Sequence, residues 1–176
     1  MSEHKILINR APVLTLWAAA VAERLGFNHN EALSLGKAVA GLNAQSKGRR
    51  LGIYKPVPKE IRQARARKRG EEFFAEICGR DVPAINTADG VRAVIKDKPI
   101  AAQGVATYLQ SKFGDSLDTV RAAMRDLAKS FPPAQLAQQA FTLYEKFRPE
   151  IPPGKAGWGA KGTLDPDRIR SLAPNK

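Results

Sequence analysis

Cysteine and histidine are scarce in this chain, and their scarcity limits the chemistry that it can carry. One cysteine, Cys78, and two histidines, His4 and His29, are spread singly along 176 residues. An internal disulfide is therefore excluded, and clusters at the spacing of metal ligands are missing. No Ser-His-Asp triad, Walker loop or nucleophile elbow can be traced either. We therefore expect no catalytic activity, no metal and no cofactor.

The sequence also lacks an apolar run long enough to cross a membrane. The longest run, residues 11–22, contains Pro12 and is interrupted by Thr15, whereas a spanning helix needs about 20 apolar residues. The run has no small-residue cleavage site of a secretory leader. A globular chain without disulfides suits a reducing compartment. We expect a cytoplasmic protein that does not contact a membrane.

Acidic residues are fewer than basic ones, 17 against 29, and the basic excess is concentrated in one segment. Residues 47–70 hold ten basic side chains and a single acidic one, Glu60, which gives this segment a net charge of +9. Since the whole chain carries +12, the remaining 152 residues contribute only +3. Charge of this density is typical of segments that bind polyanions.

Two helices are predicted immediately before the basic segment. A nearly all-apolar helix begins at Arg10 and ends at Gly26, and a capping box of Asn28 and Glu31 then starts a second helix. The second helix has one apolar stripe, and we expect Gly48 to end it. The stripe comprises Ala32, Leu35, Val39 and Leu42, and the face expected to be exposed comprises Asn30, Ser34, Lys37, Gly41 and Ala44. A buried helix, a short turn with glycine and an amphipathic helix match a helix-turn-helix.

A β-hairpin is predicted over residues 72–86, with a turn at Gly79, Arg80 and Asp81. Pro83 restricts the second strand to an edge or to its first residues. A helix pair followed by a hairpin is also compatible with a winged helix that has Arg80 at the wing tip. Cys78 has bulky apolar neighbours and no nearby histidine, so we interpret it as a small buried side chain on a strand.

From Thr87 onward the periodicity predicts helices only. Thr87 caps a short helix through Ile95, Pro99 opens the next, and Ser116 caps a regular amphipathic one. The fold class that follows is mainly α: a helix-turn-helix-like N-terminal part packed on a C-terminal helical bundle, with one small β-hairpin. We expect two parts. Residues 1–86 form the helix-turn-helix-like part, with the basic arm (47–70) and the hairpin (72–86), and residues 87–176 form the helical bundle. The two parts are expected to pack together as one unit.

A loop rich in glycine and proline spans residues 149–164 and contains a literal G-x-G-x-x-G at 157–162. The dinucleotide interpretation fails, because a Pro-Pro loop precedes the motif in place of a strand. Lys155, Trp158 and Lys161 could instead hold a phosphate or stack a base. The alternative is that Trp158 fills a gap in the bundle.

These patterns predict a small nucleic-acid-binding protein of low sequence specificity, for either DNA or RNA. The expected phosphate contacts are Lys37, Lys47, Arg49, Arg50, Arg62, Arg65, Arg67, Lys68 and Arg69. Between Lys59 and Arg69 the only large apolar residue is Ile61, which argues against a membrane surface. The alternative is a non-catalytic adaptor or dimerisation module, a homodimer included, whose basic arm docks on an acidic protein.

Five segments resemble those of conserved bacterial proteins with no assigned function. They are VAERLGF (21–27), EAL (31–33), AVAGLNA (38–44), LYEKFRP (143–149) and GWGAKG (157–162). The resemblance covers nearly the whole chain and implies a bacterial source, but no activity and no site residues.

Overall fold

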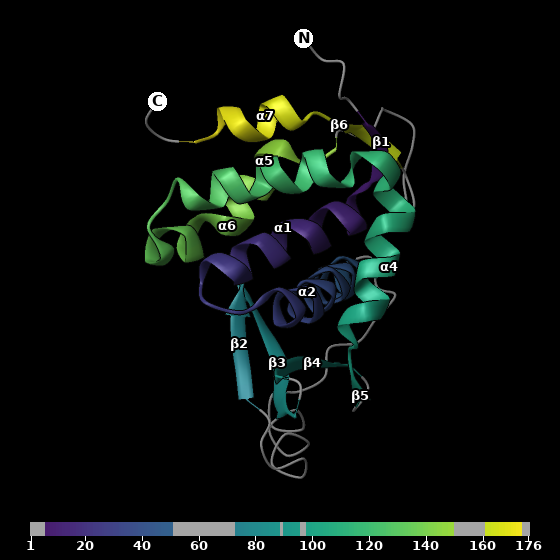
Figure 1. The fold of residues 1–176 in the computed structure, drawn as a ribbon, viewed down its shortest axis with the longest axis vertical. Coiled ribbons are helices and arrows are strands. Elements are labelled where there is room, and N and C mark those ends of the chain that lie inside the picture. Colours follow the sequence, from purple (N-terminus) through teal and green to yellow (C-terminus); the bar gives the residue numbers. More distant parts are fainter. Residues whose placement is uncertain (1–5, 51–72, 89, 96–97, 150–160, 174–176) are drawn as a thin grey trace.

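The fold is that of a computed structural model, which describes residues 6–50, 73–88, 90–95, 98–149 and 161–173, with backbone alone at 43–50 and 95. It is mixed α/β, so the expectation of a mainly α fold with a single hairpin is wrong. Helices and strands stack in layers around one central helix (Figure 1). Among the described helices, none is both long and apolar enough to span a membrane.

The central helix, α1 (Arg10–Arg24), is buried without a break from Pro12 to Ala22. Its alanines let neighbouring helices approach closely on every side. Helices α5 (Leu117–Lys129) and α6 (Pro133–Phe147) cover one side of it, and α7 (Pro166–Ser171) lies beyond α5. Trp17 fixes α1 to α6, because its indole Nε1 donates a 2.9 Å hydrogen bond to the carbonyl oxygen of Ala140.

Helix α2 (His29–Arg50) lies on the other side of α1. The predicted capping box is confirmed: Glu31 N donates to Asn28 Oδ1 at 2.8 Å, and Asn28 N donates to Glu31 Oε1 at 2.9 Å. Gly26 follows α1 with a φ of +117°, as expected of a residue after a helix end. Gly48 does not end α2, which continues to Arg50.

A four-stranded antiparallel sheet packs against α2, in the order β2-β3-β4-β5. Its strands are β2 (Phe73–Ile77), β3 (Arg80–Thr87), β4 (Gly90–Ile95) and β5 (Lys98–Pro99). The predicted hairpin is therefore present, but its turn lies at Cys78 and Gly79, whose φ values are +52° and +76°. Strand β3 is an inner strand and not an edge, and Pro83 lies just before Ala84, where the β3–β4 pairs begin.

Residues 87–95 do not form the expected short helix. They form the turn from β3 into β4, followed by β4 itself. Thr87 Oγ1 donates to the carbonyl oxygen of Gly90 at 2.7 Å, so this hydroxyl closes a turn and does not cap a helix. Gly90 has a φ of +111°, which suits a turn residue. Val91, Val94 and Ile95 then favour an extended chain, because β-branched side chains pack well on a pleated surface.

The helix-turn-helix interpretation is also wrong for α2, because the face that it would expose packs on this sheet. Ser34, expected to face solvent, is fully buried. Its Oγ donates to Ile100 O at 2.8 Å and accepts from Ala93 N at 2.8 Å. The first half of α2 is thus covered by α1 on one side and by the sheet on the other, so it cannot enter a groove of DNA.

The helix expected to open at Pro99 begins instead at Ala102, because Pro99 lies in β5, and Ser116 precedes α5 without a side-chain capping hydrogen bond. Helix α4 (Ala102–Phe113) ends at Gly114, and a 3₁₀ turn (Gly114–Ser116) leads into α5. Asp165 caps α7 through a 3.0 Å bond from Asp167 N to its Oδ1. The opening segment is a strand, β1 (Ile6–Asn9), which pairs antiparallel with β6 (Lys161–Leu164). One hydrophobic core includes residues from Ile8 to Ile169, and so draws on both predicted parts.

Candidate functional site

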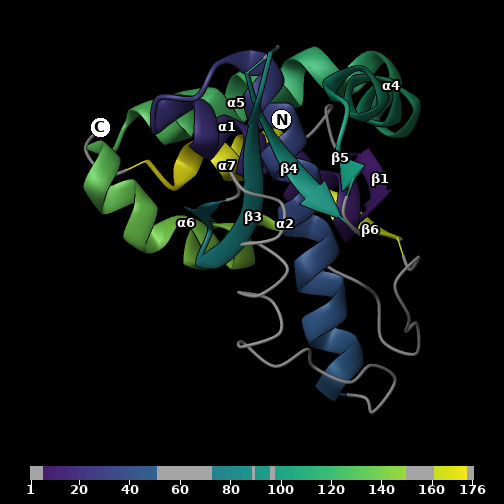
Figure 2. The same ribbon diagram turned by 90° about the horizontal axis from the view of Figure 1, so that it is seen from below.

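Most of the predicted phosphate contacts lie outside the described residues. This applies to Arg62, Arg65, Arg67, Lys68 and Arg69, and equally to Lys155 and Trp158 of the glycine-rich loop. The backbone of α2, however, is described as far as Arg50, so it places Lys47, Arg49 and Arg50 on the last turns of this helix. Figure 2 shows that the second half of α2 extends past the other helices and strands.

Lys37 lies on the first half of α2 and is separated from this projecting end. Its Nζ stands 3.7 Å from the centroid of the Tyr108 ring on α4, a cation–π contact. Burial lowers the pKa of Lys37, and the positive charge of Lys112 lowers it further. This side chain therefore already has a partner within the fold.

Lys161, the one described member of the loop set, lies at the first position of β6 opposite Asn9. It is exposed and stands next to the beginning of α1 in the register of the small sheet.

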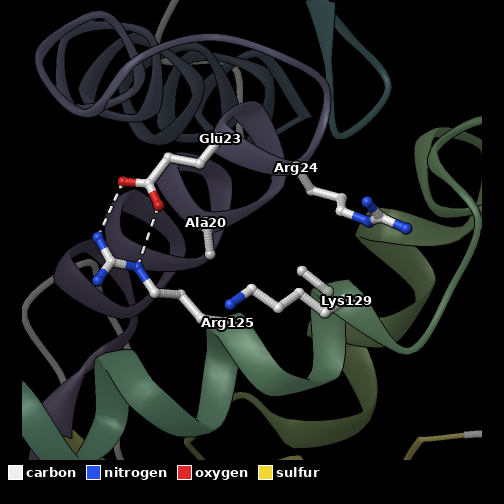
Figure 3. Close-up of a pocket in the computed structure, with 6 residues that line it drawn as sticks. Ala20, Glu23, Arg24, Arg125 and Lys129 are labelled. Carbon is white, nitrogen blue, oxygen red and sulfur yellow. Dashed lines mark hydrogen bonds and ion pairs between the residues drawn. The ribbon is translucent and has the colours of Figure 1, made fainter.

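A pocket of about 360 Å³ opens between α1 and α5, near the ends of both helices. Its lining comprises Ala20, Glu23, Arg24, Arg125, Ala128 and Lys129. In Figure 3 Glu23 and Arg125 form one wall, and the guanidinium of Arg24 points away from them. Sequence reasoning missed this pocket, because residues from helices about 100 positions apart give no local pattern.

The charged groups of the pocket are largely used within the fold. Arg125 makes a bidentate ion pair with Glu23, with Nε–Oε1 and Nη2–Oε2 distances both 3.0 Å. His29 Nδ1 lies 3.0 Å from Glu23 Oε2. Arg24 donates through Nε and Nη2 to Phe131 O, at 3.2 and 3.0 Å. The ion pair of Glu23 with Arg125 joins the end of α1 to α5, and the hydrogen bonds of Arg24 join it to Phe131, just after α5. We therefore assign the pocket a structural role.

The pKa of Glu23 follows from the same contacts. Burial alone would raise it, but hydrogen bonds from His29 and Arg125, together with their charges, bring it below the ordinary value. The carboxylate is therefore ionised at neutral pH, and its lowered pKa makes it a weak base.

Cys78 does not have the surroundings of a nucleophile. It is buried in the β2–β3 turn, and burial raises the pKa of its thiol to about 12. A thiolate is therefore not formed at neutral pH. Within the described ranges, no group of three or more His, Cys, Asp or Glu residues is placed to hold a metal ion.

Comparisons of the chain with protein families, with curated proteins and with solved structures gave no match. The resemblance to conserved bacterial proteins accordingly stays a prediction.

Proposed function

We propose that the protein binds nucleic acid with low sequence specificity, through the cationic segment 47–70. The observation that carries this proposal is the course of α2. Its first half is fixed between α1 and the sheet, while its second half extends beyond the body and ends with Lys47, Arg49 and Arg50 (Figure 2). The +9 segment therefore begins on a helix that leads away from the core.

The residue types support binding to phosphates more than to bases. Arginine and lysine neutralise phosphates and release counterions, whatever the base sequence. The proposed contacts are Lys47, Arg49, Arg50, Arg62, Arg65, Arg67, Lys68 and Arg69. Lys37 is left out because its ammonium already lies on Tyr108.

The test is the affinity for a 20-base-pair DNA duplex and for an RNA of the same length, measured from 50 to 200 mM salt. We expect micromolar or tighter binding at low salt. In a variant with Arg62, Arg65, Arg67 and Arg69 changed to alanine, the slope of log affinity against log salt for the duplex should fall by roughly three to four.

The matched control removes four exposed positive charges from the body of the protein: Lys98, Lys129, Lys146 and Arg170, each changed to glutamine. Its net charge equals that of the arm variant. If both variants lose the same affinity, binding depends on net charge and not on segment 47–70. Absence of binding by the wild type at 50 mM salt rejects the proposal.

The adaptor alternative makes a different prediction for the purified chain. Among the described residues, the exposed large hydrophobic side chains are Leu7 on β1 and Phe74 on β2, which belong to different sheets. Within the described ranges, therefore, these side chains do not form one apolar face that could hold a dimer. Sedimentation that gives a stable dimer without retention of nucleic acid would nevertheless favour the adaptor.

A further inference from the structure

The pocket between α1 and α5 has an excess of positive charge, in addition to its structural role. Its lining includes three cations, Arg24, Arg125 and Lys129, and one carboxylate, Glu23. Three positive charges and one negative charge leave this lining with a net charge of +2. The volume of about 360 Å³ lies within the range of small-molecule sites, roughly 300–1,000 Å³. The pocket is therefore large enough for a small organic anion.

Lys129 extends its charge across the pocket, whereas the two arginines are bound to groups of the fold. Arg125 donates to Glu23 through Nε and Nη2, and Arg24 donates to Phe131 O through the same two groups. Lys129 is exposed. Figure 3 shows that its ammonium extends from α5 towards Ala20 on α1 and towards Arg125. An ammonium in this position can donate up to three hydrogen bonds to an anion that enters the pocket.

The positive charge of the pocket continues along α5. Arg121, Arg125 and Lys129 follow one another at intervals of four residues, so they share one face of the helix, where like charges repel each other. The pKa of Arg121 is lowered, first by burial and then by the charge of Arg125. Asp118 lies 3.9 Å from Arg121 but is exposed, so it offsets little of this charge. An anion in the pocket would relieve the repulsion.

The ends of the two helices account for only part of the excess charge. Arg24 lies in the last turn of α1 and Lys129 in the last turn of α5. Cations are favoured there, because each helix end carries a partial negative charge of about half a unit. Two helix ends therefore offset about one of the two excess charges. About one positive charge remains in the lining, and Arg121 adds to it from the same face of α5.

We propose that this pocket binds the phosphate group of a small phosphate monoester. A phosphate monoester such as phosphoserine carries about 1.5 to 2 negative charges at pH 7, which suits a cationic site. Its terminal phosphate can enter a concave pocket, whereas a backbone phosphate of nucleic acid is flanked by a sugar on each side. Lys129 binds the phosphate, and the methyl groups of Ala20 and Ala128 contact the organic part. The inference is independent of the proposed function.

The experiment titrates the full chain with glycerol phosphate and with inorganic phosphate by calorimetry, at constant ionic strength. Glycerol phosphate should bind with a millimolar or lower dissociation constant. It should bind roughly threefold more tightly than inorganic phosphate, because its carbon atoms contact the two alanines. Lys129→Gln should weaken the binding of glycerol phosphate roughly tenfold, and Lys129→Arg, which keeps a charged donor, should stay within about threefold of the wild type.

The matched control is Lys146→Gln, which removes one exposed positive charge from α6, outside the lining of the pocket. It should bind glycerol phosphate as the wild type does. If it is weakened as much as Lys129→Gln, the effect is one of net charge and the inference is wrong. If glycerol phosphate binds no more tightly than inorganic phosphate, the pocket takes an adventitious ion only. Urea unfolding at the wild-type midpoint confirms that each variant is folded.

Duplex affinity separates this inference from the proposed function. Lys129→Gln and Lys146→Gln should bind the 20-base-pair duplex equally well. If Lys129→Gln alone loses duplex affinity, the pocket belongs to the nucleic-acid surface and the separate site is rejected. If the wild type binds glycerol phosphate but no duplex at 50 mM salt, the proposed function falls and this inference stands. If it binds the duplex but no glycerol phosphate, this inference falls and the proposed function stands.

Discussion

Glu23 is the residue through which the α1–α2 turn is held to the C-terminal helices. Its carboxylate accepts two hydrogen bonds from Arg125 on α5, and His29 at the beginning of α2 approaches the same oxygen as Arg125 Nη2. Because contacts from two other elements meet at one carboxylate, the contribution of Glu23 to stability should depend on its ionisation.

We expect Glu23→Gln to lower the free energy of unfolding by roughly 1 kcal/mol at pH 7, since the ion pair is partly exposed. The pKa of Glu23 is lowered in the folded state. Its stabilising effect is therefore present above the unfolded pKa, about 4.3, and is lost as the pH falls through the folded value. Urea unfolding at pH 7 and pH 3 should show the difference between variant and wild type shrinking at pH 3.

The control for this measurement is Glu76→Gln, an exposed carboxylate on β2 opposite Asp81. It should change stability by less than about 0.5 kcal/mol at either pH. A difference between Glu23→Gln and wild type that is the same at both pH values would contradict the role assigned to the carboxylate.

At the scale of elements, the contact between α1 and α2 depends on a residue without a side chain. A Cβ atom on Gly36 would lie 2.5 Å from Thr15 O and 3.0 Å from Ala19 N, both of which are backbone atoms. The backbone of a buried helix cannot shift as a flexible side chain can. Gly36 therefore sets how closely the two helices approach.

We expect Gly36→Ala to lower the free energy of unfolding by about 3 kcal/mol, because it forces the helices apart. The matched variant is Gly104→Ala on α4, where an added Cβ meets nothing within 4 Å. That change should stabilise the protein by about 0.5–1 kcal/mol, the usual helix preference of alanine over glycine. Urea unfolding of both variants measures the two effects, and equal effects of the same sign would refute the assignment.

At the scale of the whole molecule, the core crosses the boundary predicted near residue 86. Trp17 donates to Ala140 O, Ser34 bonds to Ala93 N and Ile100 O, and β1 pairs with β6. Each of these contacts joins the N-terminal half of the sequence to the C-terminal half.

A fragment of residues 1–86 is accordingly expected not to fold by itself. It would expose the faces of α1 that α5 and α6 cover and would leave β3 without its partner β4. Circular dichroism and urea unfolding of the fragment should show no cooperative transition, in contrast to the full chain. A cooperative transition in the fragment would mean that the first 86 residues form a domain of their own.

Much of the helical framework can be predicted from local signals. The capping box of Asn28 and Glu31, the glycines after α1 and α4, and Asp165 before α7 each act within a few residues. Strands β4 and β5 could not be predicted in this way. A threonine followed by apolar residues, as at Thr87, is compatible with a capped helix and equally compatible with a turn that leads into a strand. The ion pair of Glu23 with Arg125 escaped prediction because the two residues are 102 positions apart in the sequence.

The sequence by itself determined the capping box of Asn28 and Glu31 and the concentration of positive charge between residues 47 and 70, since each depends on neighbours along the chain. Only the tertiary structure decided that Ser34 is buried beneath a sheet, that the second half of α2 extends past the body, and that Glu23 meets Arg125. Burial and the meeting of distant charges depend on how elements pack together, and packing is a property of the whole fold.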